Sequence, residues 1–143
     1  TLKAMISFNY EIDFELPNES QISKWLSNVI LSENKKEGDI NYIFCDDEYL
    51  LEINQQYLDH DTLTDIISFD YCVGNELHGD IFISIERVRE NASDFDVKFE
   101  EELLRVMAHG VLHYCGYKDK SEEDELMMRQ KEEDKIQLFH VEQ

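Results

Sequence analysis

Two runs rich in β-branched and aromatic residues, separated by a short polar loop, constrain the fold more than any other feature of this sequence. The runs read TDIISFDY, residues 64–71, and GDIFISI, residues 79–85, and the loop between them contains Gly74 and Asn75. Such runs, bounded by turn residues, are typical of strands. A parallel pair would need a crossover helix, which this loop is too short to hold. The two runs are therefore predicted to form an antiparallel pair.

The rest of the chain alternates strand patterns with helical ones. Further strands are predicted over 5–16 and 39–45, and apolar residues at helical spacing predict helices over 21–36, 47–58, 86–95, 99–115 and 121–139. This order predicts an α+β fold in one domain, residues 1–143, with about four strands in a mixed sheet packed with about five helices. Residues 1–4 precede Met5 and are expected to be a processed leader or an expression remnant.

The charge of the chain limits the partners that it can bind. Its formal net charge is −20, and affinity for phosphate backbones comes largely from Lys and Arg, so any RNA contact must be local. Basic partners such as ribosomal proteins or assembly factors suit this acidity. No apolar run approaches the roughly 18 residues of a membrane span, and Cys45, Cys72 and Cys115 form no C-x-x-C pair. We expect a cytoplasmic protein with reduced thiols and no membrane partner.

The segment HGVLHYCGYKD, residues 109–119, has the spacing of a metal site. His109 and His113 are four residues apart and project from one face of a helix. Gly116 is expected to end that helix in a left-handed conformation, so that Asp119 turns back toward the histidines. Two imidazoles and a carboxylate leave one tetrahedral position of a catalytic ion open. We predict one divalent ion here, Zn first and Mn or another divalent ion as the alternative. The alternative is that both histidines only make hydrogen bonds at a buried helix end, with Asp119 accepting from one of them.

The residue after the first histidine bears on the chemistry. Metzincin proteases share this ligand spacing, but they carry a glutamate at that position, which serves as the general base. Gly110 occupies it here, so a protease would lack its proton acceptor, and no other side chain emerges as a base. The remaining histidines, His60, His78 and His140, have no comparable neighbouring ligands.

Three segments together resemble one known family. Residues 109–119 are similar to the signature H-G-x-L-H-L-x-G-Y-D-H of the YbeY family of metal-dependent endoribonucleases. DTLTDIISF, residues 61–69, resembles that family's D-x-P-T-D-V-L-S-F, and HGDIFIS, residues 78–84, resembles its G-D-I-x-I-S strand. The resemblance implies a hydrolase that cuts single-stranded RNA during ribosomal RNA maturation and ribosome quality control.

Two positions depart from that family's pattern. Asp119 stands where the family has a third histidine, and a carboxylate ligand should let harder ions such as Mn compete better. Leu58 stands where the family has an arginine that is expected to contact phosphate. Lys118 and Lys120 flank the third ligand, and we predict that they replace this arginine as the electrostatic contact.

Polar residues also interrupt the strand over 64–71. Thr64 and Ser68 are candidate substrate contacts, with capping or strand-edge roles as the alternative. Two other functions stay open from the sequence. A metallohydrolase acting on a peptide or ester is disfavoured by the missing glutamate. A non-catalytic ribosome-assembly factor with a structural metal is favoured by the acidity and by Leu58.

Overall fold

Every predicted strand and helix is present in the computed structural model, which describes residues 5–58 and 63–141. The strands are β1 (Ile6–Tyr10), β2 (Lys36–Cys45), β3 (Ile66–Asp70) and β4 (Glu76–Ser84), and the helices are α1 (Glu19–Ser32), α2 (Asp47–Leu58), α3 (Ile85–Asp94), α4 (Phe99–Tyr114) and α5 (Glu122–Val141). The predicted α+β fold is confirmed. Within the described ranges, no helix is long and apolar enough to cross a membrane.

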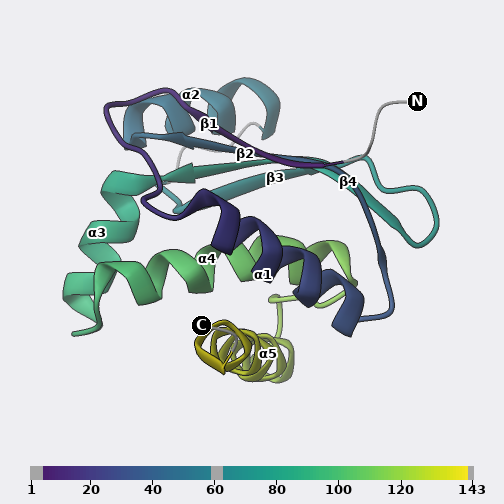
Figure 1. Ribbon diagram of the computed structural model, residues 1–143. Helices are drawn as coiled ribbons and strands as arrows, with labels where there is room; N and C mark the ends of the chain where they lie inside the picture. The colour runs from purple at the N-terminus through teal and green to yellow at the C-terminus, as the bar shows by residue number, and fades with distance from the viewer. Residues whose placement is uncertain (1–4, 59–62, 142–143) are drawn as a thin grey trace.

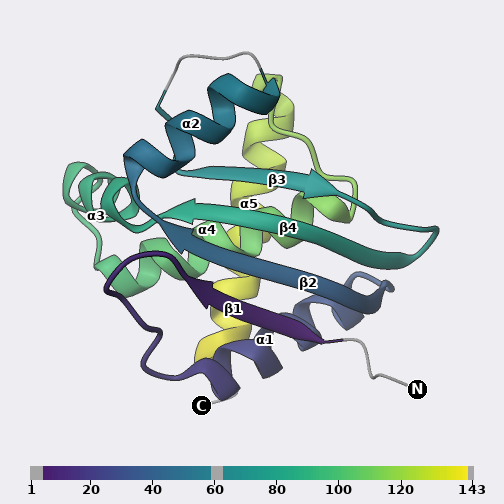
Figure 2. The same ribbon diagram turned by 90° about the horizontal axis from the view of Figure 1, so that it is seen from above.

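The four strands form one mixed sheet in the order β1-β2-β4-β3 (Figure 2). Strands β1, β2 and β4 run parallel, whereas β3 runs antiparallel to β4. The β3–β4 hairpin closes where Tyr71 N donates to His78 O at 2.9 Å, and Gly74 adopts a positive φ of +59° in the turn. The predicted antiparallel pair is confirmed, and it makes β3 an edge strand.

The first strand is shorter than its sequence pattern predicts. Pairing with β2 covers Ile6–Tyr10, and beyond it the chain turns, with Phe14 N donating to Ile12 O at 2.8 Å. Leu16 N then donates to the hydroxyl of Tyr10 at 3.1 Å. Phe14 and Leu16 pack onto the core from this loop. The predicted strand over 5–16 is therefore wrong beyond Tyr10, because the later apolar residues bury their side chains without strand pairing.

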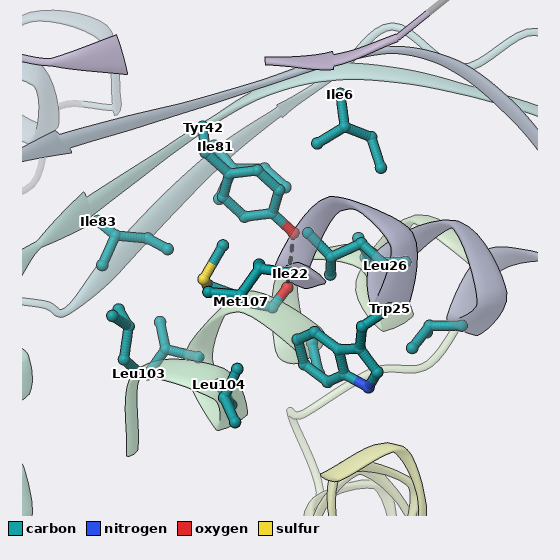
Figure 3. Packing of buried hydrophobic residues seen from close by; sticks show 14 of the residues in the cluster. Ile6, Ile22, Trp25, Leu26, Tyr42, Ile81, Ile83, Leu103, Leu104 and Met107 are labelled. Atoms are coloured by element: carbon teal, nitrogen blue, oxygen red, sulfur yellow. Dashed lines mark hydrogen bonds between the residues drawn. The ribbon is translucent and has the colours of Figure 1, made fainter. Parts of the chain in front are cut away.

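The helices cover the two faces of the sheet unequally (Figure 1). Helix α2 lies on one face, while α1 and α4 lie on the other and α5 lies beneath them. The main core fills the space between the sheet, α1 and α4 (Figure 3), and Trp25 is 1% exposed there. Inside it, the Tyr42 hydroxyl donates to the carbonyl of Met107 at 2.8 Å. This buried hydrogen bond fixes α4 against β2 two residues before His109.

Gly110 lets α4 approach the sheet closely. It is buried, and a Cβ atom added there would lie 3.0 Å from Ile81 Cδ1 and 3.3 Å from Ile66 Cδ1. This position faces the side chains of β3 and β4. A side chain at residue 110 would therefore enter the core, which explains in packing terms why the position supplies no general base.

Helix α5 is attached to α1 by polar contacts between distant parts of the chain. The indole Nε1 of Trp25 donates to the carbonyl of Lys135 at 2.7 Å. Lys135 Nζ lies 2.8 Å from Glu33 Oε2, and Glu33 also accepts from the hydroxyl of Tyr117 at 2.7 Å. The position of α5 is thus set by α1 and by the turn that follows α4.

Glu33 should make stability depend on pH. Burial raises the pKa of its carboxyl, but hydrogen bonds from Lys135 and Tyr117 outweigh burial and hold the pKa below the ordinary 4.5. A carboxylate with a depressed pKa in the folded state stabilises the protein above its unfolded pKa, and this contribution is lost as pH falls through the folded pKa. Glu33→Gln should therefore lower the free energy of unfolding by about 2 kcal/mol at pH 7.

The difference between Glu33→Gln and the parent should shrink as the pH falls below 4.5, and it should disappear once the pH is below the lowered pKa of the folded carboxyl, since the parent carboxyl is then protonated too. Urea unfolding followed by circular dichroism at neutral and acidic pH would measure it. Glu52→Gln, an exposed change in α2, is the matched control. An equal loss at both pH values would contradict the assigned role of the charge.

Candidate metal and RNA site

The end of α4 carries both predicted histidine ligands. The rings of His109 and His113 are nearly parallel, with an interplanar angle of 5° and centroids 6.5 Å apart. After them, Gly116 has a positive φ of +106°. Its N–H donates to the carbonyl of His113 at 3.1 Å, and Tyr117 N donates to the carbonyl of Leu112 at 3.2 Å. These two bonds form the Schellman ending that reverses the chain after a helix, so the predicted glycine turn is confirmed.

The turn brings Asp119 back to the first histidine. Asp119 Oδ2 lies 3.3 Å from Nε2 of His109. Bonds of about 2.0–2.2 Å to a tetrahedral zinc ion would place neighbouring ligand atoms about 3.3–3.5 Å apart. The separation of these two atoms therefore fits two ligands of a single ion.

His113 lies farther from this pair. Two imidazoles on one tetrahedral ion would have ring centres about 5 Å apart, so the ring of His113 must turn toward His109 to complete the set. Across residues 5–58 and 63–141, no group of three or more His, Cys, Asp or Glu side chains is closed enough to hold a metal ion. The donor types fit a divalent ion and two of the three donors are in position. The three-ligand assignment stays a prediction.

Glu132, which the sequence interpretation missed, holds the other nitrogen of His109. His109 Nδ1 donates to Glu132 Oε2 at 2.8 Å, and Glu132 is only 6% exposed. Glu132 lies four residues after Met128 and four before Ile136, both buried on α5. A carboxylate on an apolar helical stripe was the sequence signal that could have revealed it.

The charges around His109 favour its protonated form in the metal-free protein. Burial lowers the pKa of His109, but its hydrogen bond to Glu132 and the charges of Glu132, Asp119 and Asp65 raise that pKa above its ordinary value. Burial in turn raises the pKa of Asp65. Since a metal ion binds the unprotonated nitrogen, it must displace a proton here, and metal affinity should fall as the solution becomes more acidic.

A cavity of about 510 Å³ opens beside the histidines, between α2, β3 and α4. The three predicted ligands and both predicted substrate contacts line this cavity together, and α2 contributes two further residues. The lining residues are Asn54, Leu58, Thr64, Asp65, Ile66, Ile67, Ser68, His109, His113 and Asp119. The structure thus brings Thr64 and Ser68 to the candidate site. Leu58, where the resemblance leads one to expect arginine, gives the cavity an apolar edge and is 42% exposed.

The other predicted residues lie outside this lining. Lys118 and Lys120 are exposed on the segment that carries Asp119, and neither lines the cavity. His78 accepts from Asp39 N at 3.0 Å, and His140 lies 3.2 Å from Glu101 Oε1. His60 is outside the described residues. Lys118 and Lys120 are therefore the sequence neighbours of Asp119, which lines the cavity, but they do not line it themselves.

Comparisons with known proteins agree on one family. The family profile described as Endoribonuclease YbeY matches residues 7–140. A protein of that name from Flavobacterium psychrophilum is 76% identical, covering 97% of this chain and 99% of its own. One from Flavobacterium johnsoniae is 69% identical over 97% of this chain and 100% of its own. The solution structure of TM1509 from Thermotoga maritima has a TM-score of 0.67 at 27% identity, covering 96% of this chain and 91% of the other. The chain belongs to the YbeY endoribonuclease family.

Proposed function

We propose that this chain is a metal-dependent endoribonuclease that cuts single-stranded regions of ribosomal RNA. The observation that carries this proposal is the pairing of His109 with Asp119 at 3.3 Å on the wall of a cavity that Thr64 and Ser68 also line. Family membership supports RNA as the substrate. Sequence-specific RNA recognition mostly targets single-stranded segments, because their unstacked bases are open to contact by side chains.

The side chains around the cavity have distinct tasks in this proposal. His109, His113 and Asp119 would hold one divalent ion, with zinc favoured by the two imidazoles. Such an ion, when bound, stabilises negative charge on a phosphoryl oxygen and makes water more acidic. The hydroxyl of Ser68, which lines the cavity, would donate a hydrogen bond to a phosphate there. The hydroxyl of Thr64 donates to the carbonyl of Ile66 at 3.3 Å and would have to turn away from it to do the same. No side chain is assigned as general base. Two nucleophiles are compatible with this arrangement: water that the ion would make more acidic, and the substrate's own 2′-hydroxyl.

The acidic chain needs local cations to hold a phosphate backbone. Its net charge is −20, and several cations are already paired with carboxylates, among them Arg87 with Asp47 at 2.7 Å and Lys135 with Glu33 at 2.8 Å. Lys118 and Lys120 flank Asp119 and make no ion pair within the described residues. They are the cationic residues nearest in sequence to Asp119, a proposed ligand of the ion. We assign them the contact with the RNA phosphate backbone.

Replacing Lys118 and Lys120 together by alanine should weaken binding of single-stranded RNA and reduce its salt dependence. Each phosphate contact that is lost lowers the slope of log affinity against log salt by about 0.7 for a single strand, so the double variant should lose a slope of about 1.4. Fluorescence anisotropy at several salt concentrations would measure this slope. Lys24→Ala, an exposed change on α1, is the control. An unchanged slope would place the phosphate contact elsewhere.

The same acidity suits basic partners. We place the protein in the cytoplasm, in contact with ribosomal proteins or assembly factors whose positive surfaces would bring the cavity to the RNA.

The decisive experiment combines ion content with cleavage. The purified protein should contain about one divalent ion per chain and cleave single-stranded rRNA fragments in the presence of Zn or Mn while leaving duplexes intact. His109→Ala should lose both properties, whereas His140→Ala, which removes an exposed histidine of α5, should keep both. A metal-loaded protein that cuts no RNA would instead favour a ribosome-assembly factor with a structural ion.

A further inference from the structure

We propose that Glu132 is a positioning residue that orients His109 for the ion, an inference that rests on the proposed metal site. The two ring nitrogens of His109 face different elements. Nδ1 lies 2.8 Å from Glu132 Oε2 on α5, and Nε2 lies 3.3 Å from Asp119 Oδ2 after α4. One nitrogen is therefore occupied by a carboxylate on the far side of the ring from the proposed ion.

This arrangement selects one form of the imidazole. A carboxylate can only accept, so the nitrogen beside Glu132 must carry a proton. In a neutral imidazole the other nitrogen then carries the lone pair, and here that nitrogen is the one beside Asp119. A partner on the non-ligating nitrogen fixes both the tautomer and the ring plane of a metal-binding histidine. Glu132 thereby aims the lone pair of His109 into the cavity.

The second oxygen of Glu132 is held by Arg105, whose side chain is 15% exposed. Arg105 Nη1 lies 3.5 Å from Glu132 Oε1, and Arg105 Nε lies 3.6 Å from Glu102 Oε1. Arg105 also pairs with Glu133 through Nη2. A carboxylate that is 6% exposed is costly unless both of its oxygens have partners, and His109 and Arg105 supply them. Arg105 thus holds one oxygen of the Glu132 carboxylate while His109 holds the other, and this restricts rotation of the carboxylate away from His109.

The fold does not depend on Glu132 to place α5. The Trp25–Lys135 hydrogen bond of 2.7 Å and the Lys135–Glu33 ion pair of 2.8 Å attach this helix to α1 independently. A variant at residue 132 that preserves size should therefore keep α5 in place. This separation makes the orienting role testable apart from a purely structural one.

The test compares Glu132→Gln with Glu133→Gln. Both remove one carboxylate next to Arg105, but Glu133 has no contact with His109 and its side chain is 51% exposed. Competition for Zn²⁺ against a fluorescent chelator should show a 10- to 100-fold weaker affinity for Glu132→Gln, the range found for outer-shell partners of metal ligands. Glu133→Gln should stay within about twofold of the parent, because outer-shell losses of that size require contact with the ligand.

The second readout needs no metal. Nitrogen-15 NMR of the imidazole, at a pH where His109 is neutral, should show the proton on Nδ1 in the parent and in Glu133→Gln. Glu132→Gln should show a mixture of the two tautomers, because an amide can donate as well as accept. Parent affinity and parent tautomer in Glu132→Gln would overturn the proposal and leave Glu132 as a contact between helices. If the parent binds Zn²⁺ but cuts no RNA, the proposed function fails while the orienting role is still measured.

Discussion

Replacing Gly110 with glutamate should unfold the protein rather than give it a general base. The change would restore the residue that follows the first histidine in metzincin proteases. In this fold, however, position 110 faces Ile81 and Ile66 at 3.0 and 3.3 Å from the first side-chain carbon. A carboxylate forced into that apolar contact has no partner, and an unpaired buried charge costs several kcal/mol. With total stabilities of about 5–15 kcal/mol for native proteins, that cost is enough to lose the fold.

Gly110→Ala separates the effect of a buried charge from the effect of steric crowding at this position. A methyl group would contact the Cδ1 ends of the two isoleucines and also Cγ2 of Ile81 at 3.3 Å, while alanine is favoured over glycine in a helix interior by about 1 kcal/mol. The free energy of unfolding should therefore change by about 1 kcal/mol or less. Circular dichroism and urea unfolding would test both variants. A folded Gly110→Glu protein would show that α4 can lift from the sheet and that the position is not closed.

Asp119→Ala should remove most of the metal affinity and RNA cleavage while leaving the metal-free fold intact. The carboxylate side chain is 46% exposed, so its loss should change the stability of the metal-free protein by about 0.5 kcal/mol or less. Loss of a direct ligand should weaken Zn²⁺ binding by more than the roughly 100-fold that outer-shell changes reach. At an ion concentration 100 times the parent dissociation constant, the parent gains about 2.7 kcal/mol on binding, and the variant should gain almost none.

Thermal unfolding with and without Zn²⁺, together with cleavage of a single-stranded fragment, would measure this prediction. Asp94→Ala, which removes an exposed carboxylate from the end of α3, should behave like the parent. Asp119→His, which restores the residue of the family signature, should retain metal binding. If Asp119→Ala bound Zn²⁺ as tightly as the parent, the third ligand would have to be another group, and Asp65 beside His109 would be the first to test.

Local patterns in the sequence were sufficient for features that depend on local geometry. The loop around Gly74 is short, so the antiparallel β3–β4 pair follows from chain length alone. The approach of Asp119 to His109 follows from helical spacing and a glycine turn. In each case, the residues involved lie close together along the chain.

Features set by packing between distant elements were not predictable in this way. Glu132 reaches His109 because α5 lies beneath α4, and its hydrogen-bond partner is 23 residues away. The burial of position 110 depends on side chains from β3 and β4. The loop after β1 shows the same limit, since Phe14 and Leu16 are apolar for contacts with the core and not for strand pairing. Local periodicity carries no information about which distant surface an apolar or charged residue will meet.

Helix α5 also affects when the site is completed during protein synthesis. A growing polypeptide that has reached Asp119 already contains all three predicted ligands, but the residue that orients His109 has not yet been made. With Glu132 in that role, His109 acquires its fixed tautomer only after α5 has been synthesised and has packed against Trp25. For a nuclease proposed to act on ribosomal RNA, this order would leave His109 unoriented, and metal binding weakened, until α5 has been made and has packed.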